Sequence, residues 1–145
     1  LAAVGSDGAC WIELARARLD IGDEDGARVL LDRAAALPLD REQVIALQGA
    51  RIALIDALIE DQRRAEARAL LDAHADGLLA AVPDLSADQA ADLISVQIAL
   101  GDRRRAWQTI DAAPASPRTL IYAARLAEQE GRLDEAIAYR QRALA

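Results

Sequence analysis

The sequence predicts an all-α protein built from about four antiparallel helical hairpins. Hydrophobic residues make up 53% of its 145 residues, many of them Ala and Leu, and there is no Phe or Met. Ala and Leu are strong helix formers. Apolar residues recur at helical spacing along the chain, and Gly or Pro residues separate the segments. We therefore expect thin, closely packed helices.

The first repeat unit, residues 8–38, reads as two helices around a Gly22-Asp23 turn. Trp11, Leu14 and Ala15 lie on one face of its first helix. Pro38 ends the second helix, because proline cannot continue the hydrogen-bonding pattern. The apolar stripe of that second helix contains Ala27, Leu31 and Ala34.

The second repeat unit covers residues 40–82. Asp40 can cap its first helix, with Gln43 three residues later in the capping-box position. This helix runs to about Asp61, and apolar residues cover more than half its circumference, so we expect burial on several sides. After a turn without glycine at 61–63, the second helix continues through His74 to Val82. Its apolar stripe contains Ala67, Leu70, Leu71, His74, Leu78 and Val82.

The third repeat unit, residues 86–114, has the capping-box pair Ser86 and Gln89 and repeats the turn as Gly101-Asp102. The fourth, residues 116–145, opens on Ser116-Pro117, a cap followed by a proline suited to a helix's first turn. Gly131 separates its two helices.

A small residue opens the second helix of every hairpin. These residues are Ala27, Ala67, Ala106 and Ala136, at intervals of 40, 39 and 30 residues. The pattern predicts eight helices in four pairs with irregular spacing.

The first repeat unit resembles the tetratricopeptide repeat (TPR) family, whose pattern is W-x2-L-G-x2-Y…A-x3-F…P with a period of about 34 residues. Arg18 departs from the pattern, where the family has Tyr. The matching residues are Trp11, Leu14, Ala15, Gly22, Ala27, Leu31 and Pro38.

The resemblance implies a single repeat domain over residues 1–145, folded as a right-handed superhelical solenoid. We expect a fragment of a longer array, because the first seven residues look like the tail of a preceding segment and no polar capping helix follows Ala145. The pattern of the repeat units and the amino-acid composition also resemble the TPR region of a bacterial exopolysaccharide export protein of the Pel or cellulose type.

Charge and composition exclude several classes of function. The chain has 24 acidic and 17 basic residues, a net charge of −7. We expect no nucleic-acid partner, since phosphate contacts need a positive face. No apolar run approaches the roughly 20 residues of a membrane span, so we expect no membrane contact. A single cysteine, Cys10, excludes an internal disulfide and leaves the compartment open.

The polar residues do not form a recognisable catalytic or metal site. His74 is the single histidine, which favours a core or interface role over a metal ligand. The run 23–25 suits a helix N-terminus, and the arginines at 103–105 point in different directions on a helix. Cys10 is expected to be a small buried residue. We therefore expect no catalysis, metal or cofactor.

In the TPR family, ligands usually lie in a concave groove lined by the first helix of each pair. Trp107 has two interpretations: it covers the first helix of the next repeat unit, or it is an exposed anchor for a partner. By position, the concave groove would comprise Ile12, Arg16, Leu19, Asp20, Ile52, Asp56, Ile59, Glu60, Ser95, Ile98, Ile121, Arg125, Glu128 and Gln129.

The function that we expect is non-catalytic protein–protein scaffolding, in the bacterial periplasm and with a polysaccharide-modifying enzyme as the partner. A polysaccharide ligand is less favoured because stacking aromatic residues are scarce. The alternative is a sensor or partner-binding module of a cytoplasmic bacterial transcription regulator.

Overall fold

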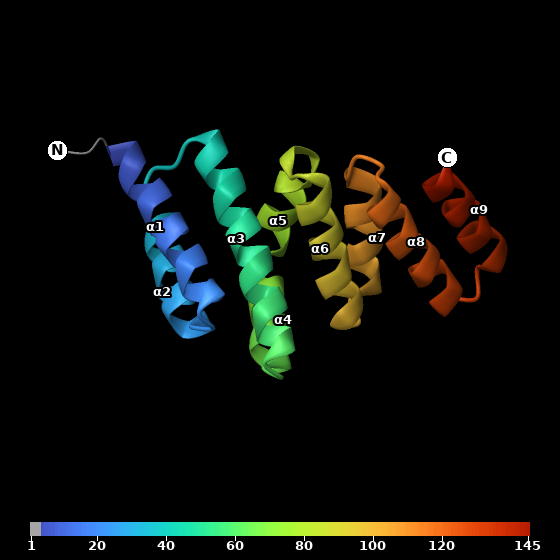
Figure 1. Cartoon of the computed structure of the whole chain (residues 1–145), viewed down its shortest axis with the longest axis horizontal. Coiled ribbons are helices and arrows are strands. Elements are labelled where there is room, and N and C mark those ends of the chain that lie inside the picture. The colour runs from blue at the N-terminus through green and yellow to red at the C-terminus, as the bar shows by residue number, and fades with distance from the viewer. Residues whose placement is uncertain (1–3) are drawn as a thin grey trace. The chain divides into compact units, whose positions relative to one another are not determined.

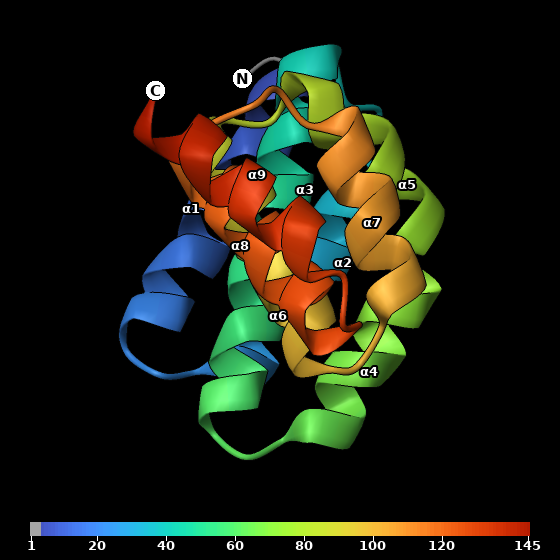
Figure 2. The same ribbon diagram turned by 90° about the vertical axis from the view of Figure 1, so that its right-hand side faces the viewer.

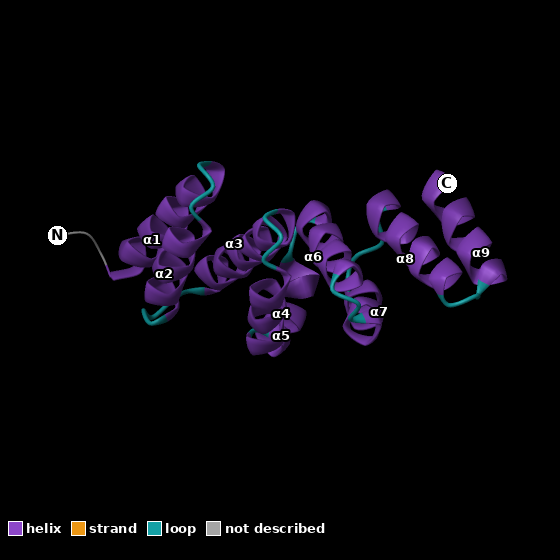
Figure 3. Ribbon diagram, turned by 90° about the horizontal axis from the view of Figure 1, so that it is seen from below, coloured by secondary structure: helices purple, strands orange, loops and turns teal. Residues whose placement is uncertain are grey.

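The computed structural model describes residues 4–145, and side chains from Asp7 onward. Within this part the protein contains nine α-helices and one short 3-10 helix, and no strand (Figures 1 and 3). The all-α prediction is therefore confirmed. The helices are α1 (Val4–Asp20), α2 (Glu24–Ala35), α3 (Arg41–Glu60), α4 (Arg64–Ala73), α5 (Ala75–Ala81), η1 (Val82–Asp84), α6 (Ala87–Ala99), α7 (Arg103–Ala112), α8 (Pro117–Gln129) and α9 (Leu133–Leu144).

The chain divides into two compact parts, which we call the N-terminal body (residues 1–77) and the C-terminal body (residues 78–145). The boundary lies within α5. Helix α1 begins at Val4, inside the segment 1–7 that the sequence analysis interprets as a tail, while residues 1–3 lie outside the described part.

In each of the four hairpins, a turn of the same geometry joins the two helices. At each turn one residue has a positive φ: Gly22, Gln62, Gly101 and Gly131, between 64° and 79°. The amide that follows donates back to a carbonyl five residues earlier, as from Asp23 to Arg18, at 2.8 Å in all four turns. These bonds satisfy carbonyls at the end of the first helix. The predicted turns are confirmed.

In the N-terminal body, α1 packs against α2, and α3 contacts α1, α2 and α4. The predicted capping box at the start of α3 is present, with Asp40 and Gln43 each accepting the other's backbone N–H, at 2.8 and 2.9 Å. Helix α3 has buried residues on several of its sides, among them Leu47, Leu54 and Leu58. Its predicted burial on several sides is confirmed.

The predicted continuous helix at 67–82 is wrong, because the helix breaks at His74. His74 has φ −112° and ψ 11° and ends α4, while α5 begins at Ala75. His, Asp and Gly are weak helix formers, and they occupy 74, 76 and 77. The bend also brings Gly77 against Gln48, where a Cβ would lie 2.9 Å from Nε2. Among residues 4–145, this break gives nine α-helices in place of the expected eight.

In the C-terminal body, α6 contacts α7 and α8, and α8 packs along α9 (Figure 2). Capping boxes begin α6 at Ser86 and α8 at Ser116. Thr119 completes the second box, a role that the sequence analysis did not assign. A small core of Ala124, Ala127 and Ala136 joins α8 to α9.

The small residues predicted to open each second helix are all buried. Ala27, Ala67 and Ala106 are 0% exposed and Ala136 is 1% exposed. A larger side chain at any of them would separate the two helices of its hairpin, since a packed core does not absorb extra volume.

Candidate functional site

A cleft lies between α1 and α3, the first helices of the two hairpins in the N-terminal body. It encloses about 530 Å³, a volume that includes space open to solvent. Small side chains leave it open, and carboxylates stand at both sides. The lining residues are Ala9, Ile12, Glu13, Glu42, Gln43 and Ala46.

The α1–α3 cleft is acidic. Glu13 and Glu42 are exposed, and no arginine of the described part of the chain lines the cleft. Arg16 lies one turn along α1, half-buried, and its Nη2 donates to the Ala46 carbonyl at 3.4 Å. That guanidinium is drawn toward the α3 backbone. The surface between the two helices therefore presents negative charge over an apolar floor.

The structure separates the predicted concave-face residues of this body by exposure. Ile12 is 1% exposed and forms only the floor of the cleft, and Ile52 is 2% exposed. Ile52 thus lies in the core of this body, and its predicted place on the binding face stays a prediction. Leu19 and Ile59 are half-buried. The exposed members are Asp20, Asp56 and Glu60.

Of the residues that line the cleft, only Ile12 was predicted to bind a partner; the others are Ala9, Glu13, Glu42, Gln43 and Ala46. Glu13 follows Ile12 directly, and Glu42 lies in the first turn of α3, where a carboxylate favours the helix dipole. Their spacing along each helix was visible, but their approach across the cleft depends on how α1 packs on α3.

In the C-terminal body, Arg118 of α8 bridges Asp88 and Asp92 of α6, at 2.9 and 3.0 Å. Of the predicted residues on these helices, Ser95 and Ile98 are half-buried. The four predicted residues of α8 are all exposed: Ile121, Arg125, Glu128 and Gln129.

Two of these exposed residues have partners within the C-terminal body. Glu128 accepts from Arg140 of α9 at 2.5 Å, and the guanidinium of Arg125 lies 5.6 Å from the Tyr122 ring centroid. Ile121, 43% exposed, is the apolar residue of this face available for contact.

Trp107 covers the following hairpin and is not a free anchor. Its ring packs against the Ala124–Ala127–Ala136 core, 6.1 Å from the Tyr139 ring. Its Nε1 donates to Glu130 at 2.9 Å, and the Arg132 guanidinium lies 4.7 Å from the ring centroid. The first of the two interpretations of Trp107 is the one that the structure shows.

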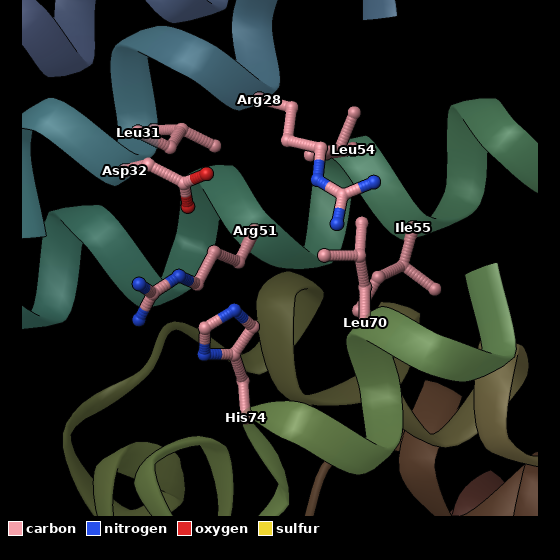
Figure 4. A pocket seen from close by; sticks show the side chains of 8 residues that line it. All are labelled: Arg28, Leu31, Asp32, Arg51, Leu54, Ile55, Leu70 and His74. Atoms are coloured by element: carbon pink, nitrogen blue, oxygen red, sulfur yellow. The ribbon is translucent and has the colours of Figure 1, made fainter. Parts of the chain in front are cut away.

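A second hollow opens between α2, α3 and α4, and Figure 4 shows its lining side chains. It encloses about 230 Å³, again including space open to solvent. Buried aliphatic side chains form its floor. Charged and titratable groups stand around it. The lining residues are Arg28, Leu31, Asp32, Arg51, Leu54, Ile55, Leu70 and His74.

Burial changes the titration of two groups in this hollow. It lowers the pKa of His74, and the nearby Arg51 and Arg28 guanidinium groups lower it further, while Asp32 opposes them. Burial also lowers the pKa of Arg51, again opposed by Asp32. His74 is therefore neutral at pH 7.

The other polar runs have structural roles. Asp23 caps α2 by accepting from the Gly26 N–H at 2.9 Å, and Arg105 pairs with Asp102 at 2.9 Å. Cys10 is exposed, so its predicted burial is wrong: it lies on the outer face of α1 beside Trp11.

Residues 4–145 contain no group of three or more His, Cys, Asp or Glu side chains arranged to hold a metal ion. No helix among them is long and apolar enough to cross a membrane.

Comparison of the chain with protein-family models, with curated proteins and with solved structures finds no match. The resemblance to the TPR family thus stays a prediction from the sequence.

Proposed function

We propose that this protein is a non-catalytic protein-interaction module with a TPR-like solenoid arrangement, and that it binds a basic segment of a partner polypeptide in the α1–α3 cleft. The observation that carries the proposal is the pair Glu13 and Glu42 on either side of a cleft floored by Ile12. The cleft lies on the first helices of its hairpins, where the TPR resemblance places ligands.

The chemistry of the cleft favours a peptide with Lys or Arg side chains. Ala9 and Ala46 leave room for a side chain to lie against the helices. The two exposed carboxylates can each accept charge-assisted hydrogen bonds from a cation. The net charge of −7 adds long-range attraction for a basic partner and repels nucleic acid.

The biological setting is part of the proposal and rests on the resemblance alone. In the periplasm, next to an exopolysaccharide export machine, the module would hold a polysaccharide-modifying enzyme. The alternative setting is a cytoplasmic transcription regulator. Fractionation of cells that express the full-length protein, followed by immunoblotting, distinguishes the two compartments.

The binding proposal can be tested with a fluorescein-labelled peptide of alternating Ala and Lys. We expect it to bind at an ionic strength of about 0.01 M, where the Debye length is about 30 Å, and to weaken at about 0.15 M. The double variant Glu13→Gln, Glu42→Gln should reduce binding by about tenfold, as expected for two weakened ionic contacts. Fluorescence anisotropy measures the affinity.

The matched control is Asp76→Asn, Asp111→Asn, which removes two exposed carboxylates that lie neither in the cleft nor among the predicted groove residues. This variant should retain most of the affinity. If both double variants lose affinity equally, the peptide responds to overall charge and the cleft is not its site.

A further inference from the structure

We propose that Arg16 makes the α1–α3 cleft selective for a partner segment in which an acidic residue lies two positions from a basic one. The inference rests on the proposed function, because it adds a second contact in the same cleft. Glu13 and Glu42 would hold the basic side chain, and Arg16 would receive the acidic one. The expected partner sequence is of the kind Lys-x-Glu or Arg-x-Glu, and not a run of basic residues.

Arg16 lies at one end of the cleft. It comes three residues after Glu13 on α1, about 4.5 Å further along the helix axis. Its Nη2 donates to the carbonyl oxygen of Ala46, a residue that lines the cleft, at 3.4 Å. Helices α1 and α3 contact each other and run in the same direction (Figure 1). The guanidinium group is therefore held against α3, one turn beyond Glu13.

The charged groups at this cleft are available to a partner. Within the described part of the chain, Glu13, Glu42 and Arg16 form no ion pair, whereas Arg63 of the same body contacts two carboxylates. The contact of Arg16 with Ala46 is longer than the roughly 2.7–3.2 Å that is usual for an N–H···O hydrogen bond. It also leaves the other N–H donors of the guanidinium group without an acceptor. The cleft thus presents two carboxylates and one cation with unused binding capacity.

Burial makes the cation of this site more demanding than the carboxylates. Arg16 is half-buried, whereas Glu13 and Glu42 are exposed. A charge partly removed from water interacts more strongly with an opposite charge than one on an open surface. It has also lost part of its hydration without gaining an ion pair. A carboxylate of the partner would supply the pair that Arg16 lacks.

An extended partner segment has the spacing that these groups require. Its residues at positions i and i+2 point to the same side and lie about 6.7 Å apart. The flexible side chains of Glu13 and Arg16 cover the difference from their separation along α1. A second basic residue at that position would meet Arg16 and be repelled, so the same side chain acts against polybasic segments.

The net charge of the protein makes this selectivity easy to recognise. At a net charge of −7, long-range attraction favours the more positive of two peptides. A local contact with Arg16 favours the peptide that carries a Glu. The two effects therefore predict opposite rankings for peptides that differ at a single residue.

The test compares three blocked peptides of sequence Ala-Ala-Lys-Ala-X-Ala-Ala, with Glu, Gln or Lys at position X. Their affinities for the whole chain are measured by NMR titration of its backbone amides, at an ionic strength of about 0.15 M, where the Debye length is about 8 Å. We expect the Glu peptide to bind about threefold more tightly than the Gln peptide, the effect of one partly exposed ion pair. The Lys peptide should bind more weakly than the Gln peptide.

Matched variants assign the effect to one side chain. Arg16→Gln should reverse the ranking of the Glu and Gln peptides, because only the long-range repulsion of the added carboxylate remains. Arg16→Lys keeps the charge and should keep the preference for Glu. Arg64→Gln changes the net charge equally at an exposed position of α4 outside the cleft, and it should leave the ranking unchanged.

The ranking with the unaltered chain needs no variant, so it tests the proposal even if Arg16→Gln fails to fold. A Glu peptide that binds no more tightly than the Gln peptide would overturn the selectivity, as would the same preference for Glu in folded Arg16→Gln. Both results would leave the binding of a basic segment intact. Absence of binding by all three peptides, or unchanged binding to Glu13→Gln, Glu42→Gln, would overturn the proposed function itself, and the selectivity with it.

Discussion

Glu24 is a buried carboxyl group, and it meets a second carboxyl group. It opens α2 with 6% of its surface exposed. A side-chain hydrogen bond with Asp61, at the end of α3, raises the pKa of Glu24, and the nearby charge of Arg63 partly opposes the shift. Two carboxyl oxygens share a hydrogen bond only when one of them carries a proton.

This pair predicts how stability depends on pH. Because the pKa of Glu24 is higher in the folded state than in the unfolded chain, the folded state binds the proton more tightly. The stabilisation is fully present below the unfolded pKa of Glu, about 4.3, and is lost as the pH rises through the folded value. Glu24→Gln should therefore raise the urea midpoint at pH 7, since the amide keeps a donor for Asp61.

Urea unfolding followed by circular dichroism at several pH values measures this effect. The advantage of Glu24→Gln over the parent should shrink as the pH falls toward 4. Glu60→Gln removes an exposed carboxylate next to the same turn and should lack that pH dependence. If the stability of both variants depends on pH in the same way, the Glu24–Asp61 pair has no specific effect on stability, and only the net charge of the protein matters.

At the residue scale, the helix-capping residues could be predicted from the sequence, whereas the exposure of individual side chains could not. The cap residues Asp40, Ser86 and Ser116 could be predicted because each acts on backbone within three residues of itself. Ile12 and Ile52 were assigned to a binding face, but both are buried. Which side of a helix is covered depends on its packing partners, and helical periodicity does not specify them.

At the scale of elements, the turn between α3 and α4 differs from the other three. Gln62 has a φ of +64°, whereas glycine occupies the equivalent position elsewhere. A residue with a Cβ pays roughly 1–2 kcal/mol for the left-handed conformation. The hydrogen bonds around the turn match those of the glycine turns: Gln62 donates to Ile59 at 3.1 Å and Arg63 to Leu58 at 2.8 Å.

We therefore expect Gln62→Gly to stabilise the protein by about 0.5 kcal/mol, because relief of the left-handed strain exceeds the extra chain entropy of glycine. The reverse change, Gly101→Ala, should destabilise by about 1 kcal/mol. No atom lies within 4 Å of the added methyl group in that variant, so the loss of stability reflects the backbone conformation and not a steric clash. Urea unfolding measures both, and a destabilised Gln62→Gly would contradict the expectation.

The elements themselves were predictable except at one place. Gly-Asp turns and capping boxes mark helix ends through local bonds, and the structure confirms them. The break at His74 has only a weak local signal, the weak helix formers at 74, 76 and 77, while the apolar stripe continues unbroken through Leu78. The hollow between α2, α3 and α4 was also hidden, since Arg28, Arg51 and His74 belong to three different helices.

At the scale of the whole molecule, the chain consists of two compact bodies. Each contains helices that bury apolar residues against one another: α1 to α4 in one, and α6 to α9 in the other. Domains of about this size often fold alone, though with modest stability. The right-handed solenoid implied by the TPR resemblance stays a prediction.

We expect residues 1–77 and residues 78–145, expressed as separate polypeptides, each to be helical and to unfold cooperatively in urea. The matched control is residues 1–61, which lacks α4 and so exposes the surface of α3 that Leu70 and Leu71 help to cover. This shorter piece should be less helical per residue and should unfold without a sharp transition. Circular dichroism compares the three, and loss of structure in both longer pieces would contradict the expectation.

The placement of Trp11 and Trp107 has a practical consequence. They are the chain's two tryptophans, one in each body, and an arginine guanidinium lies near each ring, Arg33 at 5.4 Å and Arg132 at 4.7 Å. If one tryptophan is replaced by phenylalanine, the fluorescence of the other reports on the unfolding of the body that contains it. The molecule thus carries two intrinsic fluorophores that follow its halves separately, without an added dye.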